Sequence, residues 1–181
     1  MPLVIDATVG GVASNSYATQ AAADTHALAS VGPSAAAWAA KTADQKAQAL
    51  ISATLEIDSH LPFIGERATT IQALEWPRVN ARTLTGRLYL STVLPSSLVA
   101  ATIELAISYA VNSTIDVLAV TGNNKKSVTA GDVSVTWFDP GEDTSEIDLS
   151  WLPGIVQRLL RPLIRVLVTN EWGKAVVVRT S

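Results

Sequence analysis

The segment from Pro95 to about Val111 is apolar around almost its whole circumference. Proline suits the first position of a helix, so we expect a helix to begin at Pro95. A helix that is apolar on all sides must be covered by other elements, which favours a helical bundle. Glu104 is its single charge, and a buried carboxylate must be paired or protonated. Arg82 or Arg87 is the expected partner, and a catalytic role for Glu104 is the alternative.

A second helix is predicted to begin after Thr42, which forms a capping-box pattern with Gln45. Its predicted buried face repeats every three or four residues and comprises Ala43, Ala47, Leu50, Ile51, Thr54 and Leu55. A further helical turn is predicted over Thr69–Leu74. It should stop at Trp76-Pro77, because proline disfavours helical geometry in the residue before it. Trp76 is predicted to anchor the core there.

Shorter elements flank these two helices. Thr19 is predicted to cap a helix that runs to about Ala29, and Ser34–Ala40 is predicted to be helical. Lys125–Thr129 and Asp132–Phe138 alternate around a glycine turn and predict a β-hairpin near residues 125–138. Residues 139–148 are acidic and are predicted to form a solvated loop rather than a calcium site.

Ser150 is predicted to cap the last helix, with Pro153 near its start, and Pro162 should kink or end it. At 3.6 residues per turn, one face contains Ile155, Leu159, Leu163 and Val166. A narrow opposite stripe contains Arg158, Arg161 and Arg165. This stripe is predicted to be solvated or to form salt bridges with a neighbouring subunit, and contact with a phosphate backbone is the alternative. The tail from Ala175 is predicted to add an edge strand here or to another chain.

With 181 residues, the chain is long enough for one sizeable core. We therefore expect a mainly α fold, in which a helical bundle has a small β-hairpin excursion and an extended C-terminal arm. A single helical domain is predicted over residues 1–170 and a tail over 171–181. The net charge of −3 argues against a general nucleic-acid binder.

No pattern of reactive residues predicts an enzyme. The chain has no cysteine, and His26 and His60 have none of the spacings that bind metals. Glycine-rich phosphate loops and nucleophile elbows are also absent from the sequence. We expect no catalytic residue, no cofactor and no metal. The N-terminus lacks the pattern of a signal peptide, so synthesis in the cytoplasm is expected.

Several short motifs resemble one protein family in a consistent order. They are Asn15–Tyr17, KAQALISAT at 46–54, QALEWPR at 72–78, Gly86, PSSLVAATIELA at 95–106, the hairpin at 131–137 and PGIVQRLLRPL at 153–163. Over residues 14–165 the chain resembles the head–tail connector, or adaptor, proteins of tailed bacteriophages. Members are sometimes labelled as having a DnaT-like single-stranded-DNA-binding domain.

The resemblance implies a structural protein in the neck of a virion. Copies would form a ring, commonly a dodecamer, that extends the DNA channel beneath the portal protein and receives the tail. The implied partners are the portal, a tail, stopper or tail-terminator protein, other copies of the chain, and genomic DNA that passes without sequence-specific binding. No membrane is implied. The expected interface residues are Ile155, Leu159, Leu163, Val166 and Trp172.

The alternative function is a single-stranded-DNA-binding module. It predicts that Arg78, Arg82 and Arg87 converge on one groove with an exposed aromatic ring such as Trp137, because bases stack on such rings. The connector function instead buries Trp38 and Trp76 and requires no stacking platform.

Overall fold

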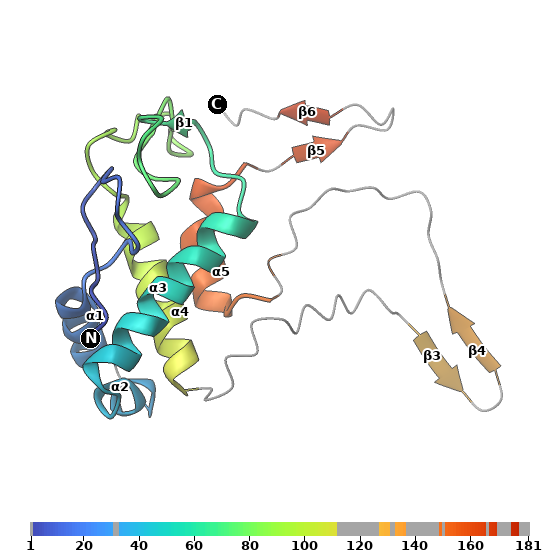
Figure 1. Cartoon of the computed structure of the whole chain (residues 1–181). Coiled ribbons are helices and arrows are strands. Elements are labelled where there is room, and N and C mark those ends of the chain that lie inside the picture. The colour runs from blue at the N-terminus through green and yellow to red at the C-terminus, as the bar shows by residue number, and fades with distance from the viewer. Residues whose placement is uncertain are drawn as a thin grey trace. The chain divides into compact units, whose positions relative to one another are not determined.

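A computed structural model describes residues 2–30, 33–111, 127–130, 133–136, 149, 151–165, 167–169 and 175–177, with backbone alone for the strands between 127 and 136 and beyond 166. These residues belong to two compact units. The helical unit contains the described residues from 2 to 111 and from 152 to 165 (Figure 1). The second unit contains two hairpins. The chain is mainly α, as predicted.

The helical unit is built from five helices. Their bounds are α1 Gln20–Ala29, α2 Pro33–Ala39, α3 Ala43–His60, α4 Ser96–Val111 and α5 Gly154–Leu160, with a 3-10 turn at Arg161–Leu163. Thr19 caps α1 by accepting a hydrogen bond from the Ala22 amide. The helices predicted at these places are thereby confirmed.

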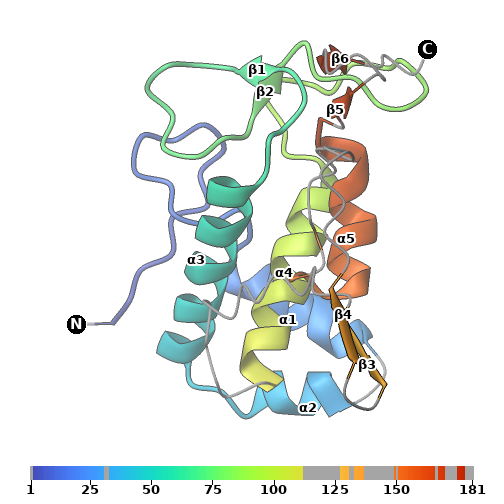
Figure 2. The same ribbon diagram turned by 90° about the vertical axis from the view of Figure 1, so that its right-hand side faces the viewer.

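Helix α4 lies at the centre of the unit, between α3 and α5 in Figure 2. It packs against α3, α5, α2 and α1. Half of its residues are buried, and they surround most of the helix: Leu98, Ala101, Thr102, Ile103, Leu105, Ala106, Ile107 and Ala110. The structure confirms the prediction that other elements cover this helix.

The capping box of α3 is confirmed, but the buried face of the helix is turned from the predicted one. The Gln45 amide donates to Thr42 Oγ1, and the Thr42 amide donates to Gln45 Oε1. Leu55, which was predicted to be buried, is 65% exposed, whereas Ile57 is fully buried. The buried face of α3 also includes alanines, which contribute little to a hydrophobic pattern and therefore do not mark this face clearly in the sequence.

The helical turn predicted over Thr69–Leu74 is wrong. Thr69 and Gln72 exchange the same two hydrogen bonds as a capping box, yet no helix follows. The Gln72 side chain also donates to Leu74 O and Pro77 O, and the Ala73 amide donates to Gly11 O. These bonds hold the backbone in a compact turn before Trp76-Pro77, which is a cis peptide.

Three two-stranded antiparallel sheets are described. Strand β1 (Glu66–Arg67) pairs with β2 (Arg78–Val79) in the helical unit. Strand β3 (Ser127–Ala130) pairs with β4 (Val133–Thr136), and Ala130 is opposite Val133, which confirms the predicted hairpin. Strand β5 (Leu167–Thr169) pairs with β6 (Ala175–Val177), so the predicted terminal strand finds a partner within the chain.

Helix α5 ends where Pro162 was predicted to interrupt it, in a 3-10 turn. Val156, Leu160 and Leu163 are fully buried. Among the described residues, no helix is long and apolar enough to cross a membrane.

Candidate functional site

Trp76 lies two residues before β2, which pairs with β1 at the top of Figure 2, and it organises this end of the helical unit. Its indole is 1% exposed. Phe63 and Tyr89 pack against it in T-shaped geometry, with ring centroids 6.0 and 5.6 Å away. Trp76 is therefore the predicted core anchor, and its ring is closed to a ligand.

A buried polar network joins this corner to α3 and to the N-terminal segment. The Tyr17 hydroxyl donates to Asp58 Oδ1 and accepts from the Trp76 amide at 3.1 Å. Asp58 Oδ2 accepts from the Glu75 amide at 3.0 Å. Burial raises the pKa of Asp58 to about 6, although the Tyr17 hydrogen bond opposes the shift, and burial also raises the pKa of Tyr17. Because these groups form hydrogen bonds with one another, we infer that the network stabilises the fold rather than binds a ligand.

Arg78 is the second member of the corner, and its guanidinium is fully engaged within the chain. It is 8% exposed. Nε donates to Ile64 O at 2.8 Å, Nη2 donates to Gly65 O at 2.9 Å, and Nη1 pairs with the Glu75 carboxylate. Arg78 therefore does not join Arg82 and Arg87 in an open groove.

Gly65 makes this arrangement possible. Its φ is +74°, and a Cβ there would lie 2.4 Å from Val79 O. Only glycine fits this position without moving β2, because the clash would be with backbone.

Arg82 and Arg87 lie in an exposed loop, residues 80–93. Arg82 Nη1 donates to Gly86 O at 2.9 Å, and the Thr83 amide donates to Arg87 O at 2.7 Å, which closes a tight turn. Four large aliphatic side chains of the loop are more than half exposed: Leu84, Leu88, Leu90 and Val93. Loop 80–93 thus combines positive charge with apolar surface.

Glu104 pairs with His26 rather than with Arg82 or Arg87, so the predicted partners are wrong. His26 Nε2 lies 2.8 Å from Glu104 Oε1, which joins α1 to α4. The two arginines belong to loop 80–93, ahead of the first turn of α4, and Glu104 is more than two turns further on. Spacing along the sequence gave no signal for His26, which is 78 residues away.

The predicted interface face on α5 is divided in the structure. Ile155 is 41% exposed and Leu159 is partly buried, whereas Leu163 is fully buried within its own chain. Val166 and Trp172 lie outside the residues whose side chains are described. The stripe residues Arg158, Arg161 and Arg165 are exposed, as is expected of a solvated stripe.

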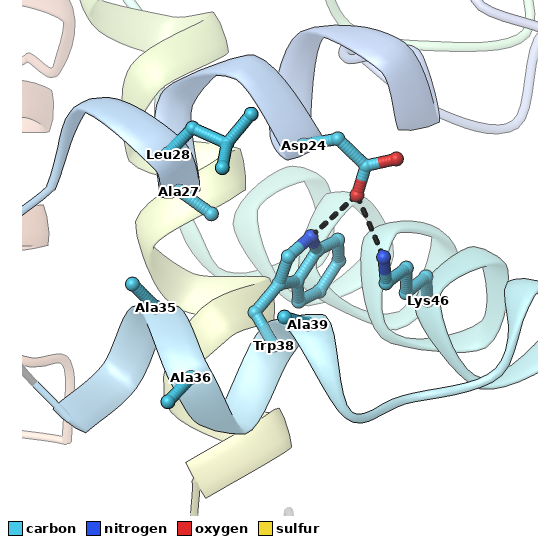
Figure 3. A pocket seen from close by; sticks show the side chains of 8 residues that line it. All are labelled: Asp24, Ala27, Leu28, Ala35, Ala36, Trp38, Ala39 and Lys46. Atoms are coloured by element: carbon cyan, nitrogen blue, oxygen red, sulfur yellow. Dashed lines mark hydrogen bonds and ion pairs between the residues drawn. The ribbon is translucent and has the colours of Figure 1, made fainter.

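A hollow of about 420 Å³ lies between α1 and α2 (Figure 3). Alanines line much of it, and Asp24 at its edge accepts hydrogen bonds from Trp38 Nε1 and Lys46 Nζ, both at 2.8 Å. Burial works against the ionised carboxylate, but these two bonds lower the pKa of Asp24 below its usual value. Trp38 is 1% exposed, so it is a core residue as expected. The polar groups here are already paired with one another, which leaves none poised for catalysis.

Within the described ranges, no cluster of three or more histidine, aspartate or glutamate side chains is placed to hold a metal ion. Taken together, these observations define a mainly α protein in which the described polar clusters join elements of the fold to one another. Over residues 1–180 the sequence matches a family described as "Putative DnaT-like ssDNA binding protein", and the chain belongs to that family. No curated protein and no solved structure matches it. The comparisons give no support to the head–tail connector resemblance.

Proposed function

We propose that this chain is a structural virion protein, a subunit of the ring that connects the portal to the tail and extends the DNA channel. The observation that carries the proposal is the apolar surface of loop 80–93, where Leu84, Leu88 and Leu90 are 64%, 54% and 69% exposed. Clustered exposed aliphatic side chains mark surfaces that other proteins cover. Their burial contributes about 25 cal/mol per Å² at each contact, and a closed ring repeats the contact.

The proposed partners are the portal protein, a tail, stopper or tail-terminator protein, and further copies of the chain. The proposed location is the neck of the virion, and the role is not enzymatic. Genomic DNA would pass through the ring without sequence-specific binding. The motif order at 72–78 and 95–106 supports this proposal by resemblance.

Single-stranded-DNA binding is the second candidate, and the family description favours it over the connector role. It requires basic residues beside aromatic rings on which bases stack. Among the described residues, Trp38 and Trp76 are buried, Tyr89 packs against Trp76, and Arg78 is engaged internally. Arg82 and Arg87 are exposed and available to phosphate. Trp137 lies outside the described residues.

One experiment separates the two candidates. The mass of the purified protein is measured alone and with the portal protein of the same phage, and a fluorescent oligonucleotide reports DNA binding. The connector proposal expects a ring-sized complex with the portal and no oligonucleotide shift at moderate salt. Salt-sensitive oligonucleotide binding without portal association would replace it with the second candidate.

Matched variants test the surface itself. Leu84→Ser/Leu88→Ser/Leu90→Ser should abolish the portal complex and leave the circular dichroism spectrum unchanged, because these side chains are exposed. The control is Leu28→Ser/Leu55→Ser, which also changes exposed leucines but outside loop 80–93. Equal loss in both variants would show that loop 80–93 has no special role.

A further inference from the structure

Arginine is concentrated in two short segments of this chain. Seven of its eight arginines lie between residues 67 and 87 or between 158 and 165. The structure brings these segments to the same end of the helical unit, since Phe63 beside the second segment and Tyr89 of loop 80–93 both pack against Trp76. The Ile64 amide donates to Leu163 O at 3.0 Å, and the Arg165 amide donates to Pro62 O at 2.8 Å. We call Arg82, Arg87, Arg161 and Arg165, all exposed, the arginine end.

The four arginines of the arginine end outnumber the exposed carboxylate described near them, that of Glu66, a residue that pairs with Val79 across β1 and β2. The sequence contains no acidic residue between Glu75 and Glu104. Glu75 is occupied by Arg67 and Arg78. Among the described residues, no carboxylate forms an ion pair with any member of the arginine end. A positive surface of this kind attracts an acidic partner, most strongly at low salt.

The surrounding surface indicates a protein partner rather than a nucleic acid. The exposed side chains beside the arginines are aliphatic, namely Leu84, Leu88 and Leu90. Tyr89, the aromatic residue of loop 80–93, meets Trp76 edge to face at 5.6 Å and is partly buried. Bases need exposed ring faces for stacking, whereas an acidic peptide with apolar residues is complementary to arginines beside leucines.

The sequence of this chain contains a segment with that chemistry. Residues 139–148 include five carboxylates and no lysine or arginine, and Phe138 and Ile147 supply apolar side chains. We propose that the arginine end of one copy docks the acidic segment 139–148 of a second copy. This inference rests on the proposed assembly function and names the contact between its subunits. Such a contact joins two different surfaces, so repetition closes a ring when the rotation allows it.

The test uses the full chain with charge-reversed variants. Sedimentation velocity at roughly 50 mM and 500 mM NaCl should show self-association at the lower salt and its loss at the higher. Arg82→Glu/Arg87→Glu and Glu142→Arg/Asp143→Arg should each weaken self-association about tenfold or more, because each places like charges in contact. Mixing the two variants should restore association, since each contact between unlike variants again joins opposite charges at the substituted positions.

Controls keep the result specific. Lys41→Glu alters charge at the opposite end of the helical unit, between α2 and α3, and should leave association unchanged. Thermal unfolding checks that each variant folds. A wild-type chain that stays monomeric at low salt, or a mixture that fails to regain association, overturns the proposal.

A nucleic-acid partner is tested in the same samples with a fluorescent oligothymidylate. Tight binding that is lost in Arg82→Glu/Arg87→Glu but kept in Glu142→Arg/Asp143→Arg would reassign the arginine end to phosphate. Portal binding by the charge-reversed variants is scored separately. A wild-type chain that binds the portal but does not self-associate at low salt would refute this contact and leave the connector proposal standing, whereas loss of portal binding by the wild-type chain would refute the connector proposal alone.

Discussion

Replacing Arg78 with methionine distinguishes a structural arginine from one that faces a ligand. Methionine keeps an aliphatic stem near Phe63, above which the guanidinium lies at 5.9 Å. The change removes the donors to Ile64 O and Gly65 O and leaves Glu75 without its closest cation. Hydrogen bonds to charged groups contribute about 1.5–3 kcal/mol each, and solvent around the partly exposed Glu75 reduces its share. We expect the free energy of unfolding to fall by about 3–5 kcal/mol.

Urea unfolding measures this loss. With a slope of about 1–3 kcal/mol per M, the midpoint of Arg78→Met should fall by roughly 2 M. Arg82→Met is the matched control and should change stability by no more than about 0.5 kcal/mol, since Arg82 is exposed. A loss below about 1 kcal/mol for Arg78→Met, or an equal loss in both variants, would refute the structural role. Unchanged stability with weakened oligonucleotide binding would place Arg78 at a DNA site.

Three further changes test interactions that stabilise the helical unit. The pKa of Asp58 rises from 3.8 to about 6 on folding, so this group stabilises the fold below about pH 4 and loses that contribution as pH rises through 6. Asp58→Asn should remove a decline of up to about 3 kcal/mol from the pH dependence of urea unfolding, and an unchanged pH dependence would contradict this. Thr42→Ala removes half of the capping box and should cost about 1 kcal/mol, seen as a melting temperature about 2–4 °C lower. Leu105→Ala should cost about 2–5 kcal/mol by leaving a cavity beside α4, and a cost under about 1 kcal/mol would mean that the helix is loosely covered.

Local chemistry made the helix starts predictable. The side chains of Thr42 and Gln45 each accept a hydrogen bond from the other's backbone amide within one turn. Pro95 directly precedes α4, where the fixed backbone angle of proline suits the start of a helix. Thr69 and Gln72 show the limit of such patterns. They form the same exchange, but the Gln72 side chain binds Pro77 O and the chain turns away. The outcome depended on contacts that lie beyond the motif.

Pairings between distant segments were less accessible from the sequence. The partner of Glu104 is set by the packing of α1 on α4, and His26 had no pattern that linked it to a carboxylate. The buried face of α5 differs from the predicted face, because Val156 and Leu160 enter the core and Ile155 remains 41% exposed. The concentration of arginine was visible in the sequence, but its gathering at one end required the bonds between residues 62–64 and 163–165.

The order of the helices along the chain has a consequence for biosynthesis. Helix α4 ends at Val111, yet α5, which covers one of its sides, starts at Gly154. At about 5–20 residues per second, a ribosome needs roughly 2–9 s to make the residues between them. During that interval the most apolar of the described helices lacks the side chains of α5 that cover it. Newly made chains should therefore be clients of ribosome-associated chaperones until residue 165 has emerged.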